Sequence, residues 1–253
     1  MEGTAQTHLT PARSIAAKDA IVAFSGVRFS WPGKRPFSLA IGSFELRRGE
    51  RLLLIGPSGS GKSTFLSLLA GIVVPQSGRI EVLGTDTAAL SGAARDRFRA
   101  EHFGIIFQMF NLLPYGSVID NVTLPLSFSA ERNTRAGGDT QRLTSAVRLL
   151  TALGLERSLI DDGAKAASFS VGQQQRVAAA RALIGAPEII VADEPTSALD
   201  RNLQIAFLDL LFAETTAAGS SLIMVSHDES LSPRFDRTLR LEDIAVSSRG
   251  GQS

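Results

Sequence analysis

The stretch GPSGSGKST at residues 56–64 decides the fold of this 253-residue chain. It fits the spacing GxxxxGK followed by Ser or Thr, in which glycines let backbone amides close around a phosphate because no Cβ obstructs the approach. A glycine-rich turn could match by chance, since 23 residues of the chain are glycine, but a match at all eight positions argues against it. The fixed positions are Gly56, Gly61, Lys62 and Ser63, with Gly59 as an extra glycine.

The segments on either side of this loop support the match. Residues 51–55 (RLLLI) form a short apolar run typical of a buried parallel strand, and residues 65–70 (FLSLLA) have the pattern of a helix. The motif requires a strand, a glycine loop and a helix, and the helix N-terminus adds free amides beneath a bound phosphate. In this context Lys62 would reach the β- and γ-phosphates of a nucleotide, and the Ser63 hydroxyl would ligate Mg²⁺.

Two further apolar runs end in residues that suit phosphate chemistry. Residues 189–192 lead into Asp193 and Glu194, and residues 222–225 precede Ser226 and end close to His227. Ligands of an open parallel sheet gather beyond the carboxyl ends of its strands, so we expect these ends to converge. Asp193 could then bind Mg²⁺ through water, Glu194 could polarise a hydrolytic water, and His227 could contact a γ-phosphate. The alternative for the acidic pair is a turn after a buried strand.

A helix start lies between these runs, in FSVGQQQR at residues 169–176. Ser170 suits an N-cap, the alanine-rich residues 177–184 favour a helix, and Pro187 lies just past its end. The helix therefore offers its N-terminus to an anion. The plainer interpretation is a capped helix without a ligand.

The composition excludes several classes of protein. Lys and Arg number 26 against 25 Asp and Glu, so the net charge of +1 gives no reason to expect a nucleic-acid partner. Without cysteine the chain has neither disulfides nor thiolate metal sites, which suits a reducing compartment. The longest apolar stretch, near residues 65–74, is too short to span a bilayer, so we expect a soluble chain. The polar segment 130–140 (AERNTRAGGDT) is typical of a surface loop.

In order and spacing, these motifs resemble those of the ATP-binding subunits of ABC transporters, from about residue 21 to residue 243. The glycine loop resembles the Walker A motif of that family. IIVADEP resembles its Walker B strand, with Asp193 on Mg²⁺ and Glu194 as general base. The resemblance implies ATP and Mg²⁺ as cofactors and ATP hydrolysis as the reaction. The loop residues that would contact the nucleotide are Gly56, Pro57, Ser58, Gly59, Ser60, Gly61, Lys62, Ser63 and Thr64.

Four shorter motifs complete the resemblance. Gln108 in IIFQMFNLLP resembles the Q-loop glutamine, a Mg²⁺ ligand and catalytic residue, and His227 in MVSHD resembles the catalytic H-loop histidine. FSVGQQQR resembles the signature, and residues 197–200 (SALD) resemble the D-loop. The family implies a head-to-tail homodimer with ATP between one copy's phosphate loop and the other's signature. The residues that would serve the other copy's nucleotide are Ser170, Gly172, Gln173 and Asp200.

The resemblance also implies a place and a partner. ATP binding would close the dimer, hydrolysis would open it, and the motion would pass near Gln108 to membrane permease subunits on separate polypeptides. The chain would then lie on the cytoplasmic face of the inner membrane. Residues 107–126 are most similar to the branch that contains lipoprotein-release and macrolide-export ATPases. Nothing in the sequence selects the transported substrate or the direction of transport.

Two other functions compete with this interpretation. One is a slow ATP-dependent module that recruits cell-division or cell-envelope machinery, which basal turnover and the identity of a co-purifying membrane partner would distinguish. The other is a DNA-repair or chromosome ATPase. Such proteins separate their two nucleotide motifs by long coiled coils, whereas Lys62 and Asp193 are 131 positions apart (193 − 62 = 131) with no heptads between them. That spacing argues against the second alternative.

Two positions depart from the family pattern or leave a choice open. Trp31 in RFSWPGK stands where the family carries an aromatic residue that stacks on adenine, and the alternative is a tryptophan packed at a strand end. Val171 replaces the first glycine of the usual LSGGQ signature, and Phe169 replaces its leucine. A Cβ at position 171 would cost about 1–2 kcal/mol if the backbone needed a positive φ. If the position is an ordinary helix start, which we favour, Val171 only adds bulk.

The expected fold is α/β, of the P-loop NTPase class, with a RecA-like parallel-sheet core and an antiparallel β subdomain near the N-terminus. We expect flexible tails at residues 1–20 and 246–253 around an ATP-binding domain at residues 21–245. A helical subdomain at about residues 88–168 would be inserted in this domain. Within it, the helical spacing of four residues predicts that they face the subdomain core: Leu143, Val147, Leu150 and Leu153.

Overall fold

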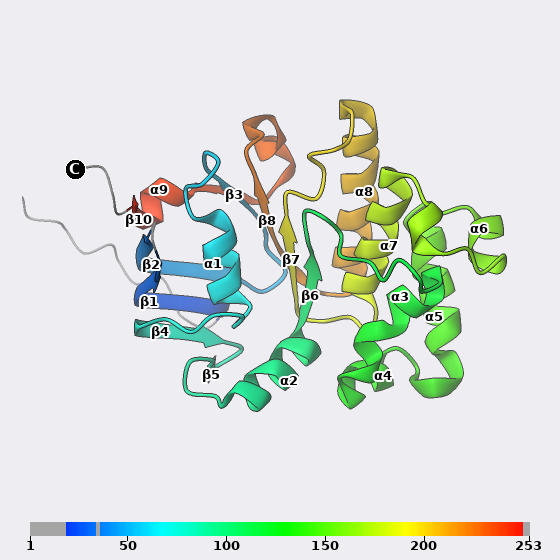
Figure 1. Cartoon of the computed structure of the whole chain (residues 1–253), viewed down its shortest axis with the longest axis horizontal. Coiled ribbons are helices and arrows are strands. Elements are labelled where there is room, and N and C mark those ends of the chain that lie inside the picture. The colour runs from blue at the N-terminus through cyan, green and yellow to red at the C-terminus, as the bar shows by residue number, and fades with distance from the viewer. Residues whose placement is uncertain (1–18, 34–35, 250–253) are drawn as a thin grey trace, which may run out of the picture.

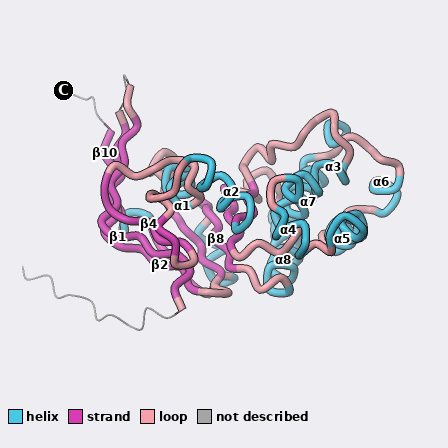
Figure 2. Tube along the Cα trace, turned by 90° about the horizontal axis from the view of Figure 1, so that it is seen from below, coloured by secondary structure: helices cyan, strands magenta, loops and turns pink. Residues whose placement is uncertain are grey.

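The computed structural model describes residues 19–33 and 36–249, which form two β-sheets and a group of helices (Figure 1). Figure 2 shows the antiparallel strands at one end of the molecule and most helices at the other. This arrangement confirms the predicted α/β fold with an antiparallel β subdomain. The tail expected at residues 1–20 lies outside the described residues up to residue 18, and Ala20 already belongs to the first strand.

The antiparallel sheet has the strand order β10-β2-β1-β4-β5. Its longest strand alternates with a period of two in two parts, because an irregularity at Gly26 shifts the phase: Val22 and Phe24 are buried before it, and Val27 and Phe29 after it. The buried face packs against helix α1, which follows the phosphate loop. The strands are β1 (Ala20–Trp31), β2 (Phe37–Arg47), β4 (Ser77–Val82), β5 (Thr85–Asp86) and β10 (Ala245–Arg249).

The parallel sheet has the strand order β6-β7-β8-β3-β9. Its central strands are continuous apolar runs because helices cover both faces, so no solvent-facing alternation remains. The three apolar runs expected to be parallel strands are β3, β7 and β8, which pair directly as neighbours. The strands are β3 (Arg51–Ile55), β6 (Phe103–Ile106), β7 (Ile189–Asp193), β8 (Ser221–Ser226) and β9 (Arg237–Arg240).

Helices flank the parallel sheet and form a separate layer beside it (Figure 1). Those nearest the sheet are α1 (Lys62–Leu69), α7 (Val171–Leu183) and α8 (Arg201–Ala217). The helical layer contains α3 (Val118–Thr123), η1 (Leu124–Ser127), α4 (Ala130–Arg135), α5 (Gly138–Ala152), α6 (Arg157–Asp161) and η2 (Ala166–Ser168). The remaining helices are α2 (Gly92–His102), η3 (Glu229–Arg234) and α9 (Leu241–Ile244).

The helical layer differs from the expectation in two respects. Strand β6 of the parallel sheet falls inside the range 88–168, so the continuous helical part begins only after it. Residues 130–140, expected to form a surface loop, contain helix α4 and the start of α5. The Ser129 hydroxyl accepts a hydrogen bond from the Arg132 amide and caps α4, so a polar segment forms a helix that tertiary contacts hold in place.

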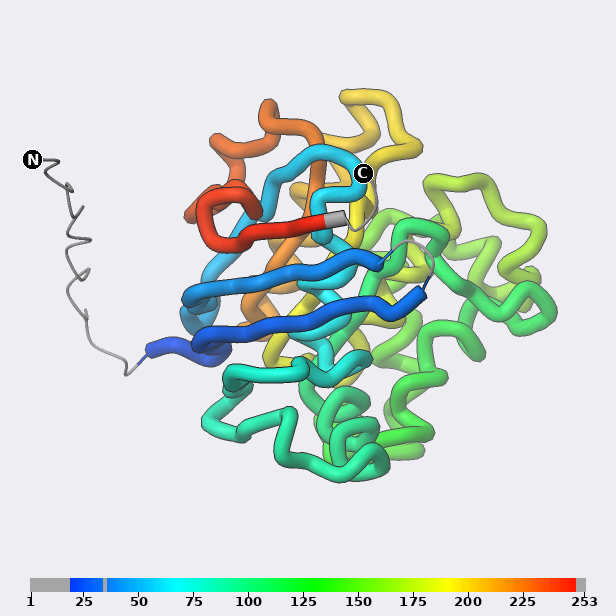
Figure 3. The backbone as a smooth tube through the Cα atoms, turned by 60° about the vertical axis from the view of Figure 1, so that its left-hand side comes forward, coloured from blue at the N-terminus to red at the C-terminus, as the bar shows by residue number. Residues whose placement is uncertain are grey.

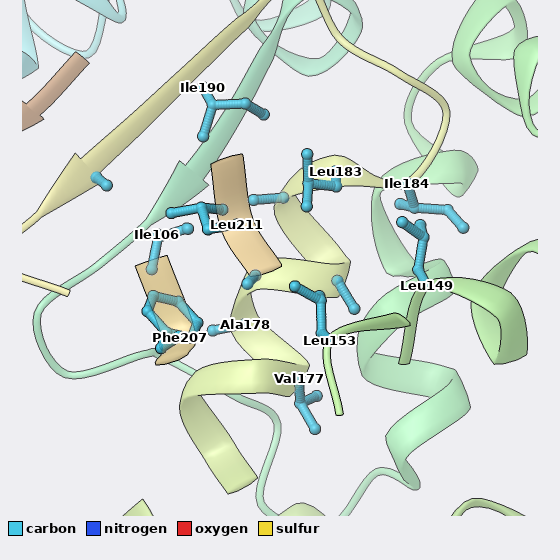
Figure 4. Close-up of a cluster of buried hydrophobic side chains, with 14 of the residues drawn as sticks. Ile106, Leu149, Leu153, Val177, Ala178, Leu183, Ile184, Ile190, Phe207 and Leu211 are labelled. Carbon is cyan, nitrogen blue, oxygen red and sulfur yellow. The ribbon is translucent and has the colours of Figure 1, made fainter. Parts of the chain in front are cut away.

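The helical subdomain shares one hydrophobic core with the parallel sheet. Figure 4 shows Leu149 of α5 and Leu153, the residue that caps its C-terminal end, near Val177 and Leu183 of α7, with Ile190 of the sheet beyond them. Of the four residues expected in this core, Leu150 and Leu153 are fully buried and Val147 packs against the core. The prediction is wrong for Leu143, which is 55% exposed because it lies in the first turns of α5, beyond the covered part of the helix.

A second core joins α1 to the antiparallel sheet. The Phe65 ring of α1 stacks on Phe24 at 5.2 Å and meets the edge of Phe44 at 4.9 Å. All three rings are buried, and aromatic pairs of this geometry contribute about 0.5–1.5 kcal/mol beyond their buried area. The phosphate loop is therefore anchored on its helical side by an aromatic cluster.

The C-terminal end of the described chain corrects another prediction. Residues 246–249, expected to be part of a flexible tail, lie in strand β10, which pairs with β2 from Ile41 to Phe37. Figure 3 shows this red strand beside the blue N-terminal strands. Without β10, the edge of β2 would have unpaired backbone N–H and C=O groups. Strand β10 forms hydrogen bonds with these groups and buries little side-chain surface.

Gly104 allows β6 and α7 to approach closely, and we expect Gly104→Ala to destabilise the protein. A Cβ at this position would lie 2.1 Å from the Ala182 carbonyl oxygen and 2.7 Å from Ile190 Cδ1. Overpacking of this kind costs about 1–3 kcal/mol, which would lower the urea midpoint of unfolding. Gly92→Ala is the matched control because the added Cβ would meet no atom of a neighbouring element within 4 Å, and it should leave the midpoint unchanged or higher. Equal midpoints for both variants would contradict the close packing.

Candidate active site

The carboxyl ends of β3, β7 and β8 open into one pocket of about 630 Å³. Its wall includes residues that follow each of these strands, as expected for an open parallel sheet. Trp31 and Phe37, from the end of the β1–β2 hairpin, close one side. The full lining is Trp31, Phe37, Ser58, Gly59, Gly61, Lys62, Ser63, Thr64, Gln108, Asp193, Glu194 and His227.

The phosphate loop has the backbone that its glycines predict. Gly59 and Gly61 have φ angles of 74° and 112°, in the left-handed region that favours glycine. Gly61 is also crowded, since a Cβ there would lie 2.8 Å from the Phe37 ring and 3.1 Å from Leu39. Gly61 caps α1, so the free amides of the helix N-terminus border the pocket.

Lys62 is held inside the curve of the loop. Its ammonium group donates hydrogen bonds to the Gly56 carbonyl at 2.7 Å and the Pro57 carbonyl at 3.1 Å. It also lies 3.6 Å from Glu194 Oε1, and only 7% of its side chain is exposed. A buried cation beside free amides makes this part of the pocket suitable for an anion.

The two acidic residues after β7 have different surroundings. Asp193 accepts a hydrogen bond from the Ser63 hydroxyl at 3.0 Å. Glu194 has a φ of 45°, a left-handed conformation that costs a non-glycine residue free energy and is found at functional sites. Its Oε2 lies 2.7 Å from His227 Nδ1, a distance at which the ring N–H donates to the carboxylate. Glu194 thus bridges Lys62 and His227.

Burial raises the pKa of Asp193 above its ordinary value. The hydrogen bond from Ser63 opposes this rise, the charge of Glu194 adds to it, and the charge of Lys62 opposes it. A cation at Asp193 would favour the ionised carboxylate. The oxygen atoms of Asp193, Ser63 and Gln108, which all border the pocket, are the ligand type that Mg²⁺ prefers.

A Mg²⁺ ion in this pocket would need ligands from a nucleotide as well as from the protein. Among residues 19–33 and 36–249, no group of three or more His, Cys, Asp or Glu side chains is arranged to hold a metal ion. Mg²⁺ typically binds through one or two protein carboxylates together with substrate phosphates and waters, and Asp193 beside the phosphate loop matches that pattern.

Trp31 is fixed in position at the edge of the pocket. Its indole N–H donates to the Thr64 hydroxyl at 3.1 Å, and its ring meets Phe29 edge-on at 4.9 Å. It nevertheless remains 41% exposed. The ring therefore packs at a strand end and still offers surface to a ligand, and its stacking on adenine stays a prediction.

Phe37 is a pocket residue that the sequence reasoning missed. It is the cross-strand partner of Trp31 and packs against the backbone of Gly61. The signal that could have identified it was the hairpin itself, since an aromatic residue opposite Trp31 in the register must face the same side of the sheet.

The signature residues do not border this pocket. Ser170 caps α7 in a reciprocal pair with Gln173, whose backbone amide donates to the Ser170 hydroxyl at 3.3 Å and whose side-chain oxygen accepts from the Ser170 amide at 2.9 Å. Asp200 caps α8 through one hydrogen bond, which its carboxylate accepts from the Leu203 amide at 3.0 Å. Gly172 lies in the first turn of α7, where an added Cβ would meet only Leu199 Cδ2, at 3.9 Å.

Val171 is the first residue of α7 and is 48% exposed. It is not among the non-glycine residues with positive φ. The position is therefore an ordinary helix start, which is the alternative that we favoured from the sequence. The valine side chain adds apolar surface beside Ser170 and carries no backbone strain of the left-handed kind.

Comparison with known proteins shows which protein family has these motifs. The family model described as ABC transporter matches residues 39–197. An uncharacterized ABC transporter ATP-binding protein, YbbA of Escherichia coli K12, is 40% identical over 210 residues, covering 83% of this chain and 88% of the relative. The lipoprotein-releasing system ATP-binding protein LolD of Novosphingobium aromaticivorans is 39% identical over 201 residues, covering 79% and 86%.

A longer relative and a solved structure agree with these matches. The macrolide export ATP-binding/permease protein MacB of Bradyrhizobium diazoefficiens is 39% identical over 213 residues, which are 83% of this chain but 31% of that protein. The dimeric post-hydrolysis structure of the ATP-binding cassette MJ0796, bound to ADP and phosphate, superposes with a TM-score of 0.76 at 30% identity, covering 92% of this chain and all of that one. The sequence motifs, the pocket and these matches together place the chain in the ABC transporter family.

Proposed function

We propose that the chain is the ATP-hydrolysing subunit of a transporter complex of the export or lipoprotein-release type. The observation that carries this proposal is the convergence of a phosphate loop, an acidic pair and a histidine in one pocket. The names of the LolD and MacB relatives support the type of complex.

The nucleotide would lie with its phosphates in the loop and its base beside Trp31. Lys62 would exchange its carbonyl partners for the β- and γ-phosphate oxygens, which are stronger acceptors for an ammonium group. Mg²⁺ would be held by Ser63 and Gln108, with Asp193 reached through water. The ion would neutralise charge on the phosphates while the protein positions the reacting groups.

Glu194 is placed to act as the general base. It would take a proton from the water that attacks the γ-phosphorus, while the bond to the leaving ADP oxygen breaks. The hydrogen bond to His227 fixes its Oε2, which leaves Oε1 as the oxygen nearer Lys62 and the phosphate end of the pocket. His227 would orient Glu194 and contact the γ-phosphate.

A second copy of the chain would complete the site. Ser170, Gly172, Gln173 and Asp200 lie at helix starts outside their own pocket. At the start of α7, the amides of Val171 and Gly172 have no partner within the helix and suit an anion on another molecule. The dimeric MJ0796 cassettes support such an arrangement.

An apolar groove supports a membrane permease as the other partner. This groove of about 490 Å³ lies between α2, the start of β6 and η1. Its walls include Phe103, Ile105 and the 63% exposed Phe128, together with four arginines, of which Arg132 and Arg181 are buried. A permease segment that inserts an apolar side chain into this groove would contact β6 directly. Gln108 lies two residues after the end of β6. The complex would then lie on the cytoplasmic face of the membrane.

No helix in the described part of the chain is both long and apolar enough to cross a bilayer.

The proposed partner is tested by a photo-crosslinking amino acid at position 128. With membranes from the source cell, we expect an adduct with an integral membrane protein, because the Phe128 side chain is exposed beside the groove. The same group at Leu143, an exposed leucine outside the groove, is the matched control and should give no adduct. Adducts only with membrane proteins of the cell-division or cell-envelope machinery, or only with soluble scaffolds, would favour the recruitment alternative and contradict the transporter assignment.

Removal of the proposed base should separate binding from hydrolysis. We expect Glu194→Gln to lower ATP turnover by about 10²- to 10⁴-fold, since an amide cannot accept the proton from water. ATP binding should persist, and the variant should accumulate as an ATP-bound dimer in light scattering. Glu229→Gln changes a carboxylate that pairs with Arg240 at the surface and should keep the parent's turnover. Full activity of Glu194→Gln would exclude it as the base.

Removal of the indole should weaken nucleotide binding. Stacking of a base on an aromatic side chain contributes roughly 1–3 kcal/mol, so Trp31→Ala should raise the Kd for ATP about 5- to 150-fold. Trp31→Phe keeps a ring and should recover most of the affinity, although it loses the hydrogen bond to Thr64. Calorimetric titration measures both. An unchanged Kd for Trp31→Ala would leave packing against Phe29 as the only role of the side chain.

A further inference from the structure

Arg132 of helix α4 is a buried charged residue that does not border the nucleotide pocket. Only 2% of the residue is exposed, yet its guanidinium donates five hydrogen bonds, which is the full number of N–H groups that arginine carries. All five acceptors are backbone carbonyls of other elements. They belong to Ala100 (3.2 Å), Phe103 (2.9 Å), Arg181 (3.3 Å), Ala182 (2.6 Å) and Ile184 (2.6 Å).

These carbonyls belong to two segments that are far apart in the sequence. Ala100 and Phe103 lie where α2 ends and β6 begins, and β6 leads to Gln108. The other three acceptors lie in the last turn of α7 and just beyond it. The last four carbonyls of a helix have no partner within it, and a cation near them is favourable, so Arg132 caps α7 from another element.

Arg135, one turn later on α4, bonds to the same two segments. Its Nε donates to the Gly185 carbonyl at 2.8 Å, and its Nη2 donates to the Glu101 carbonyl at 2.8 Å. Gly185 has a φ of 69°, and a Cβ there would lie 2.4 Å from Arg132 Cγ. The turn after α7 is thus shaped around these two side chains, which we call the α4 clasp.

The clasp carries an electrostatic cost. Burial is the main cause that lowers the pKa of Arg132 to about 9; the charge of Arg135 contributes to this lowering, and the charge of Glu188 opposes it. The guanidinium therefore remains charged at neutral pH but poorly hydrated. An apolar side chain of similar volume would avoid this desolvation but would leave the five carbonyls without these donors, so the guanidinium both satisfies these backbone groups and fixes the two segments relative to one another.

Helix α7 connects the clasp to the signature. The helix has 13 residues, with Ser170 as its N-cap and the clasp at its C-terminal end. An α-helix of this length spans about 20 Å and behaves as a rigid rod, so a tilt at one end displaces the other. Displacement of a contact by about 1 Å can cost roughly 10²-fold in activity.

We propose that Arg132 is a positioning residue for the two-copy nucleotide site. By tying the last turn of α7 to the junction of α2 and β6, it fixes where Ser170 meets the nucleotide of the second copy relative to Gln108. This proposal rests on the proposed function, in which the signature serves another molecule. It goes beyond that function because neither Arg132 nor α4 borders the pocket of about 630 Å³.

The positioning role and a purely structural role predict different measurements. Nucleotide binding by a copy's own loop does not involve α7, so loss of the clasp should leave it intact. Dimer closure does involve α7, so loss of the clasp should impair it. A purely structural role would lower both together, in proportion to the unfolded fraction.

The experiment compares these two quantities in full-length Glu194→Gln protein, with and without Arg132→Met. Trp31 is the only tryptophan and borders the pocket, so its fluorescence reports ADP binding by single copies. Light scattering reports the ATP concentration that gives half-maximal dimer. We expect an unchanged Kd for ADP and an increase of about 10- to 100-fold in the ATP concentration needed for dimerisation.

Two further variants keep the test decisive. Arg132→Lys keeps the charge but has three donors in place of five, so it should shift dimerisation in the same direction by a smaller factor. This variant carries the test if Arg132→Met does not fold. Arg142→Met removes an exposed arginine that pairs with Asp139, and it should match the parent in both measurements.

The outcomes separate failure of this proposal from failure of the proposed function. Ser170→Arg in the same background should block dimerisation if the signature serves a second copy. If Ser170→Arg dimerises as the parent does, the two-copy site itself is wrong. If Ser170→Arg is blocked while both Arg132 variants dimerise at the parental ATP concentration, the positioning role is wrong. A parallel loss of ADP binding and dimerisation in the Arg132 variants would also overturn it.

Discussion

The parallel pairing of β8 with both β3 and β7 is the constraint on which the rest of the structure depends. Parallel neighbours place their carboxyl ends at the same edge, so three loops from distant parts of the sequence meet there. Asp193 is the last residue of β7, His227 directly follows β8, and Lys62 starts the helix after the loop that follows β3. The parallel direction of the strands therefore brings these side chains into one pocket. Each side chain needs only to lie at the correct distance from the end of its strand.

The two parts of the proposed nucleotide site, the phosphate loop and the signature, lie on different rigid elements of the fold. The phosphate loop is anchored through the aromatic cluster of Phe24, Phe44 and Phe65, whereas the signature begins a helix whose other end is held by Arg132. One anchor is apolar and the other is a buried cation bonded to carbonyls. Apolar packing tolerates small shifts, but a planar guanidinium with five fixed donors specifies one geometry, which suits the proposed role of α7 in presenting its N-terminus to a second copy.

Local chemistry explains which predictions from the sequence were correct. Glycines mark the loop because only they adopt the φ angles of positions 59 and 61 at little cost, and apolar runs mark the central strands because both faces are covered. Helix starts such as Ser170 are equally local, since a cap requires only its own first turn. The predictions that failed concern Leu143, the strand at residues 246–249 and the segment 130–140. In each of these cases, burial or strand pairing depends on whether a segment far away in the sequence packs against the residue.

The sequence by itself determined the phosphate loop, the acidic pair, the capped signature helix and the parallel core, because each depends on residues adjacent in the chain. Only the tertiary structure decided that Phe37 faces the pocket, that Glu194 lies between Lys62 and His227, and that a polar segment carries a buried arginine. A polar pattern indicates solvent exposure unless unpaired carbonyls elsewhere in the fold require a donor. The carbonyls that Arg132 satisfies come from helix and strand ends that meet only after folding.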